Sequence, residues 1–149
     1  MSRTMVIGVG NALRGDDAAG LQVARRLSEQ GVANVHESSG ETASLIELWR
    51  DAGCVLIADA AQSGAEPGTV TRYDASAESL PAKSFQCSTH FFGVAEAIEL
   101  ARALDSLPAR VIVFGIEAVS FDHGAPLTAA VAEGVASAAT MIAEELSHA

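Results

Sequence analysis

Cysteine is scarce in this sequence, where Cys54 and Cys87 are the only two among 149 residues. Neither belongs to a Cys-x-x-Cys pair, so the chain has no disulfide scaffold, thiolate zinc motif or dithiol redox motif. No apolar run approaches the roughly 20 residues of a membrane span. The apolar stretch at residues 5–9 is too short for a signal peptide and is typical of a buried strand. These absences predict a cytoplasmic protein that does not contact membranes.

Basic residues are also few in this chain. Nine lysines and arginines stand against 19 aspartates and glutamates, which gives a formal net charge of −10. This balance argues against binding to nucleic acid or anionic lipid, since both require basic patches. With 49% hydrophobic and 19% charged residues, the composition is that of a globular protein. We expect residues 1–149 to form a single domain and a monomer.

Short apolar runs alternate with longer helical patterns along the chain. The apolar and β-branched runs predict strands at residues 4–9, 34–37, 54–58, 69–73 and 110–116. The 3.6-residue patterns predict helices at residues 18–30, 42–52, 88–104 and 128–147. The run at 69–73 alternates and suits an edge or antiparallel strand, whereas the other pattern is typical of a parallel sheet. We therefore expect an α/β fold of three layers, with a mostly parallel twisted sheet and helices on both faces.

Acidic residues follow two of the predicted strands. Asp16 and Asp17 come after the first strand, and Asp59 comes directly after the strand at 54–58. In such folds, ligands bind at the carboxyl ends of the strands. One acid of the pair can serve the N-terminus of the next helix, which leaves the other free to face the cleft. Asp59 has the alternative of being a turn residue.

His90 lies at the start of a predicted helix. A single histidine is more often packed or solvated than a ligand, but here two acids converge on the same edge. Two carboxylates and an imidazole suit a divalent metal such as zinc or nickel. Glu117 and His123 are further candidates for lining this edge, whereas His36 and His148 are weaker ones.

Other chemistries have little support in the sequence. The GVGN segment begins like a dinucleotide-binding loop, but Leu13 stands where that motif requires its third glycine. Asp16 and Asp17 would also repel a pyrophosphate. No Gly-x-Ser-x-Gly nucleophile elbow is present. Cys87 is close to His90 in the sequence, but this proximity alone does not make an activated nucleophile.

A family resemblance rests on four segments. They are GVGNALRGDDAAG at 8–20, LIADAAQSG at 56–64, STHFFGVAEAIELA at 88–101 and GIEAVSFDHGAPLT at 115–128. In this order they resemble the hydrogenase maturation proteases, the endopeptidases that mature the large subunit of nickel–iron hydrogenases. The acidic pair is followed by Ala18 where that family often has glycine, and its glycine–threonine segment appears here as Gly40-Glu41-Thr42.

The resemblance implies cleavage of one peptide bond near the C-terminus of the large-subunit precursor, and the same three-layer fold. It implies metal ligands at Asp17, Asp59 and His90, the residues that their places at the strand ends also select. The metal would be nickel carried by the precursor, although zinc or cadmium could also occupy such a site. Water would attack the peptide bond, activated either by an acid such as Asp16 or by the metal. The resemblance therefore predicts four catalytic residues, which are Asp16, Asp17, Asp59 and His90.

Three other functions stay open on the sequence alone. A nickel-binding accessory protein would use the same ligands without proteolysis. A nucleotide-binding regulator would use the GVGN loop. A metal-independent acid protease would use Asp17 and Asp59 as an aspartyl pair and would not need His90.

Overall fold

The computed structural model describes residues 3–81 and 93–148, and these contain one five-stranded sheet. In spatial order its strands are β2 (Val35–Ser38), β1 (Arg3–Val9), β3 (Ala52–Ala61), β5 (Arg110–Glu117) and β4 (Val70–Asp74). Neighbouring strands are parallel, except that the edge strand β4 runs antiparallel to β5. The predicted antiparallel edge strand is therefore confirmed.

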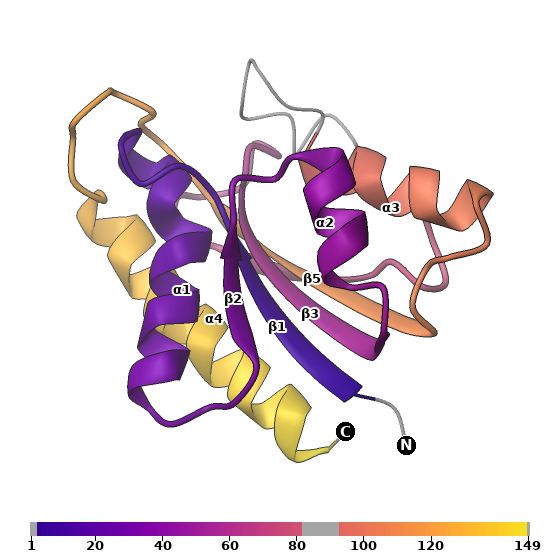
Figure 1. The fold of residues 1–149 in the computed structure, drawn as a ribbon. Coiled ribbons are helices and arrows are strands. Elements are labelled where there is room, and N and C mark those ends of the chain that lie inside the picture. The colour runs from indigo at the N-terminus through magenta and orange to yellow at the C-terminus, as the bar shows by residue number, and fades with distance from the viewer. Residues whose placement is uncertain (1–2, 82–92, 149) are drawn as a thin grey trace.

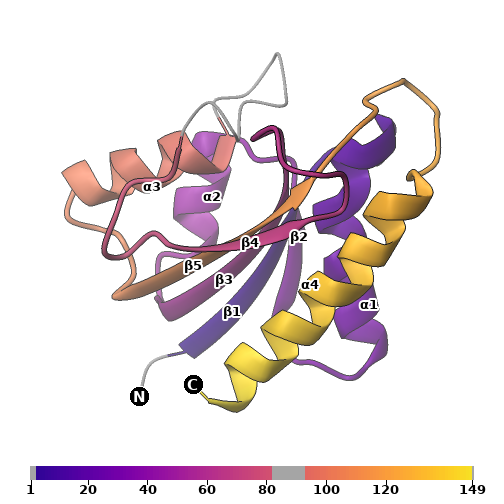
Figure 2. The same cartoon turned by 180° about the vertical axis from the view of Figure 1, so that it is seen from behind.

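Among the described residues, four α-helices cover the two faces of the sheet (Figure 1). They are α1 (Ala19–Glu29), α2 (Thr42–Leu48), α3 (Gly93–Ala103) and α4 (Ala129–Ser147), and a 3₁₀ helix, η1 (Gly15–Ala18), precedes α1. Helix α1 packs against α4 on one face, and α2 packs against α3 on the other, as the opposite views of Figures 1 and 2 show. The predicted three-layer α/β fold is confirmed.

The sheet separates two hydrophobic cores, because successive side chains of a strand point to opposite faces. On β1, Met5, Ile7 and Val9 pack with residues of α2 and α3, while Val6 packs with residues of α1 and α4. Cover on both faces explains why β1, β3 and β5 have continuous apolar sequences. The buried Cys54 belongs to the second core. No helix in the described ranges is long and apolar enough to cross a membrane.

Helix α2 is shorter than predicted. It ends at Leu48 rather than at Ala52, because Ala52 already pairs with Arg3 at the start of β3. Its first helical residue is Thr42. The N-cap is Glu41, whose carboxylate accepts a backbone hydrogen bond from the first turn.

Strand β3 is longer than predicted and runs through Asp59 to Ala61. The extra residues continue the ladder with β5, with Asp59 opposite Gly115 and Ala61 opposite Glu117. The prediction that Asp59 follows the strand is therefore wrong, and so is its alternative as a turn residue. The acid is accommodated within a strand because it lies at the carboxyl edge of the sheet, beyond the last pairing of β3 with β1.

Helix α1 touches the sheet through backbone atoms at Gly20. A Cβ atom at Gly20 would lie 2.3 Å from the carbonyl oxygens of both Val9 and Ala58, which is far inside van der Waals contact. Similarly, a Cβ atom at Gly8 would lie 2.2 Å from the Gly20 carbonyl oxygen. These close approaches hold the start of α1 against the carboxyl ends of β1 and β3.

We expect Gly20→Ala to lower the free energy of unfolding by at least about 1–3 kcal/mol, the usual cost of overpacking a core. This loss should occur although alanine is the better helix former. Urea unfolding would measure it, with Ser28→Ala at an exposed position of the same helix as the control. Equal stability of the two variants would contradict the close approach.

Candidate functional site

The acidic pair Asp16–Asp17 lies in η1, between the end of β1 and the start of α1. This segment folds back onto the strand, since the Asn11 N–H donates to the Asp17 carbonyl oxygen at 3.1 Å. A Cβ atom at Gly10 would lie 2.0 Å from the same oxygen, so the turn requires glycine there. Asp17 is thereby held at the carboxyl edge of the sheet.

The structure brings Asp17 and Asp59 together at this edge. Their exposed fractions are 5% and 6%, so both are largely withdrawn from water. Burial raises the pKa of Asp17 to about 6, although the charge of Arg14 opposes the shift. Burial also raises the pKa of Asp59 well above its usual value, and the charge of Asp17 raises it further against the opposing Ala60 N–H. The two acids form one buried pair whose charges repel each other.

Asp16 has a different environment, although it is fully buried too. Its carboxylate accepts hydrogen bonds from the backbone N–H groups of Val119, Ser120 and Thr128 at 2.9, 3.0 and 2.8 Å. Burial raises the pKa of Asp16, but the hydrogen bonds from Thr128, Ser120 and Val119 together outweigh burial and leave this pKa below its usual value. Asp16 thus tethers the loop that follows β5.

Thr128 stands at the N-cap of α4, where the sequence places the start of that helix. Its hydroxyl does not cap α4 but donates to the Asp16 carboxylate. No side chain caps α1 or η1 either. The expectation that one acid of the pair caps the following helix is therefore wrong, because the long-range contacts of Asp16 take precedence.

Glu117, the last residue of β5, tethers a second loop. Its two carboxylate oxygens accept hydrogen bonds from the Ser63 N–H at 3.1 and 3.0 Å. The Ser63 hydroxyl donates at 2.7 Å, and the Gly64 N–H donates at 3.2 Å. Glu117 lies at the predicted edge, and its contacts fix the loop that follows β3.

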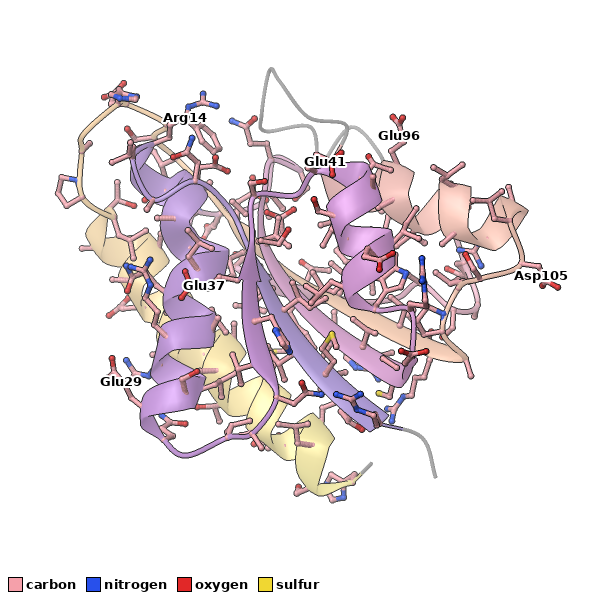
Figure 3. All side chains as sticks on the ribbon, in the orientation of Figure 1. Arg14, Glu29, Glu37, Glu41, Glu96 and Asp105 are labelled. Atoms are coloured by element: carbon pink, nitrogen blue, oxygen red, sulfur yellow. The ribbon has the colours of Figure 1, made fainter. Side chains whose placement is uncertain are left out.

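Arg14 is a residue of this edge that the sequence did not reveal. It forms an isolated β-bridge with His123, which brings the His123 loop to the edge as expected. Its guanidinium lies 5.8 Å from the centre of the Phe121 ring, within the range of a cation–π contact. Figure 3 shows Arg14 beside η1, above the start of α1. These partners are so distant in the sequence that no local pattern could identify them.

His90, the third predicted ligand, and Cys87 lie outside the described residues. The described chain resumes at Gly93, whose Cα atom would lie 4.0 Å from a Cβ atom at Gly40, near the end of β1. Within the described ranges, no group of three or more His, Cys, Asp or Glu side chains is placed to hold a metal ion. The metal-ligand role of the three predicted residues therefore stays a prediction.

The acids of this edge have two kinds of environment. Asp16 and Glu117 accept several hydrogen bonds from loops, whereas Asp17 and Asp59 are buried against each other. A buried pair of acids is stabilised by a bound cation or by a shared proton. This arrangement suits divalent-cation or acid–base chemistry and disfavours phosphate binding.

We expect Asp16→Asn to lower the free energy of unfolding at pH 7 by about 1–3 kcal/mol, because the amide loses hydrogen bonds from buried donors. Since the pKa of Asp16 is lowered by folding, the difference from wild type should be full above its unfolded value of 3.8. It should be lost as the pH falls through the lower folded value. Urea unfolding measures this, and the exposed Asp122→Asn in the same loop should change little. An unchanged free energy of unfolding in Asp16→Asn would contradict the role of Asp16 in fixing the loop after β5.

We expect Asp17→Asn to act in the opposite direction and to raise the melting temperature of the metal-free protein at neutral pH. An acid whose pKa is raised by folding destabilises the fold once the pH exceeds its unfolded value. Because the folded pKa of Asp17 is about 6, the gain in stability should be complete well above pH 6. It should vanish near pH 4, the unfolded pKa of an aspartate. Melting curves measured over this pH range provide the check. A loss of stability in Asp17→Asn at neutral pH would contradict a destabilising burial of the Asp17 carboxylate.

Comparisons with known proteins identify the family of this chain. The chain matches the family model for hydrogenase maturation proteases over residues 22–145. The hydrogenase expression/formation protein HupD of Rhodobacter capsulatus is 31% identical over 87% of this chain. HupD of Thiocapsa roseopersicina is 30% identical over 97% of it. The matches cover 64% and 67% of those two proteins, so this chain spans about two thirds of the length of these curated relatives.

Solved structures share the whole fold. The hydrogenase maturating endopeptidase HybD from E. coli is similar with a TM-score of 0.81 and 25% identity, covering 98% of this chain and 93% of that one. The [NiFe] hydrogenase maturation protease HybD from Thermococcus kodakarensis gives a TM-score of 0.72 at 29% identity, covering 97% and 98% of the two chains. The chain therefore belongs to the hydrogenase maturation protease family.

Proposed function

We propose that this protein is an endopeptidase that removes a short C-terminal segment from the nickel-loaded large-subunit precursor of a nickel–iron hydrogenase. Membership of the protease family supports the reaction type. The observation that carries the proposal is the buried pair of Asp17 and Asp59 at the carboxyl edge of the sheet. Two acids in this position cost stability, and such a cost is typical of residues that a reaction requires.

The nickel belongs to the substrate in this proposal. A divalent ion carried by the precursor would offset both the burial of Asp17 and Asp59 and their repulsion. His90 is the proposed third ligand, and carboxylate and imidazole donors suit nickel, with zinc or cadmium as substitutes. The protein would thus distinguish metal-loaded precursor from metal-free precursor, because only the loaded form neutralises the pair.

Peptide hydrolysis requires a water molecule that loses a proton as it attacks the carbonyl carbon. The sequence suggests either Asp16 or the metal as the activator of this water. In the structure, the Asp16 carboxylate accepts hydrogen bonds from Val119, Ser120 and Thr128. These contacts favour activation at the nickel of the substrate over activation by Asp16. Asp17 and Asp59 would then position the scissile bond through that ion.

The test is to incubate the protein with nickel-loaded and nickel-free precursor and to measure release of the C-terminal segment by mass spectrometry. We expect cleavage of the loaded precursor alone, and a loss of at least about 100-fold in Asp17→Asn, Asp59→Asn and His90→Ala. Asp105→Asn is the matched control, since Asp105 is exposed at the far end of α3 (Figure 3). Intact precursor mass with the wild-type protein would instead support an accessory protein that binds nickel without proteolysis.

A second candidate is a metal-independent aspartyl protease. The interaction between Asp17 and Asp59 favours it, because two buried acids that share one proton are the catalytic pair of aspartic proteases. Such an enzyme would cleave nickel-free precursor, tolerate chelators and keep its activity in His90→Ala. The same assay therefore separates the two mechanisms.

A further inference from the structure

Two loops beside the acid pair are joined by their backbones. The Gly124 N–H donates to the Leu13 carbonyl oxygen at 2.7 Å, and the Asp16 N–H donates to the Ser120 carbonyl oxygen at 2.7 Å. An isolated β-bridge lies between these bonds, and the Asp16 side chain adds the contacts described above. We call these two segments, residues 13–16 and 119–124, the clasped rim. Their backbone groups bind one another, so the rim presents side chains to a partner.

Large apolar side chains are exposed at the two ends of the clasped rim. Leu13 is 61% exposed and Val119 is 53% exposed. In the described part of the chain, the other exposed large apolar residues are Leu100 and Leu104, at 42% and 63%, near the end of α3. A single exposed leucine needs no explanation, but two exposed apolar side chains on loops fixed beside the buried acids make these loops a candidate for contact with a partner.

The clasped rim is continuous with the acid pair. Val119 follows Ala118, whose N–H donates to the Ala61 carbonyl oxygen at 2.9 Å, two residues beyond Asp59 on β3. On the other loop, Leu13 lies two residues before η1, the 3₁₀ helix that contains Asp17. A polypeptide whose scissile bond reaches the acid pair therefore passes within reach of the rim.

Charge indicates which kind of partner fits. The chain carries a net charge of −10, and the acid pair lies beside the rim, so nucleic acid and anionic lipid are disfavoured. Arg14, whose guanidinium lies over the Phe121 ring within the rim, adds one cation to this surface. A polypeptide fits this mixed surface, since it offers apolar side chains and carbonyl oxygens together.

We propose that the clasped rim selects the substrate, and that Leu13 and Val119, one at each end of the rim, bind apolar side chains of the precursor next to the scissile bond. This inference rests on the proposed function and adds the residues that set its specificity. Because hydrogen bonds to Asp16 hold the rim in place, little conformational freedom is lost on binding. Leu13 and Val119 act on substrate affinity and take no part in the bond-breaking step.

The test compares Leu13→Ser and Val119→Ser with Leu104→Ser, a change at an equally exposed leucine remote from the rim. We expect each rim variant to raise the KM for nickel-loaded precursor about tenfold or more, with little change in kcat, because binding to the ground state and to the transition state is lost equally. Leu104→Ser should match wild type. Leu13→Met should restore most of the affinity, and all melting temperatures should be unchanged.

A direct measurement of precursor binding distinguishes a failure of this inference from a failure of the proposed function. If wild-type protein does not cleave the precursor, the proposed function fails, and titration calorimetry with loaded precursor then tests the rim alone. Weaker precursor binding by Leu13→Ser than by Leu104→Ser supports substrate binding at the rim, whether or not the wild-type protein cleaves the precursor. Equal binding by both variants overturns it, as does a wild-type dimer that Leu13→Ser dissociates, which would assign the surface to a second copy of this chain.

Discussion

The backbone contact between Gly20 and the ends of β1 and β3 is the constraint on which the site depends. Because no side chain separates helix from sheet there, η1 is drawn over the carboxyl edge, and Asp17 comes within electrostatic range of Asp59. A larger separation would admit water, and the two acids would then ionise independently. The glycines of this segment therefore set the electrostatics of the site as well as its packing.

The remaining acids of the edge supply the support that such a pair needs. Asp16 joins η1 to the loop after β5, and Glu117 joins the end of β5 to the loop after β3. Three segments around Asp17 and Asp59 are thereby connected by charge-assisted hydrogen bonds. The hydrogen bonds of Asp16 and Glu117 fix the loops around Asp17 and Asp59 and offset the cost of burying that pair. This is the usual relation between a reactive site and its supporting residues.

The sequence was sufficient for the fold class because the central strands are apolar throughout and the helices have clear 3.6-residue patterns. It also indicated Asp17 and Asp59, since the carboxyl ends of parallel strands meet at one edge. It did not predict that β3 continues past Asp59, because that extension depends on the length of β5. The tethering role of Asp16 and the position of Arg14 depend on contacts with residues 119–128, which no local pattern reveals.

The site described above requires that Asp17 and Asp59 interact unfavourably when both are charged. A double-mutant cycle tests it most directly, using the free energies of unfolding of Asp17→Asn, Asp59→Asn and the double variant at neutral pH without metal. We expect the double variant to gain less stability than the sum of the gains of the two single variants, because either single change already relieves the repulsion. Additive effects, within about 0.3–0.5 kcal/mol, would contradict it.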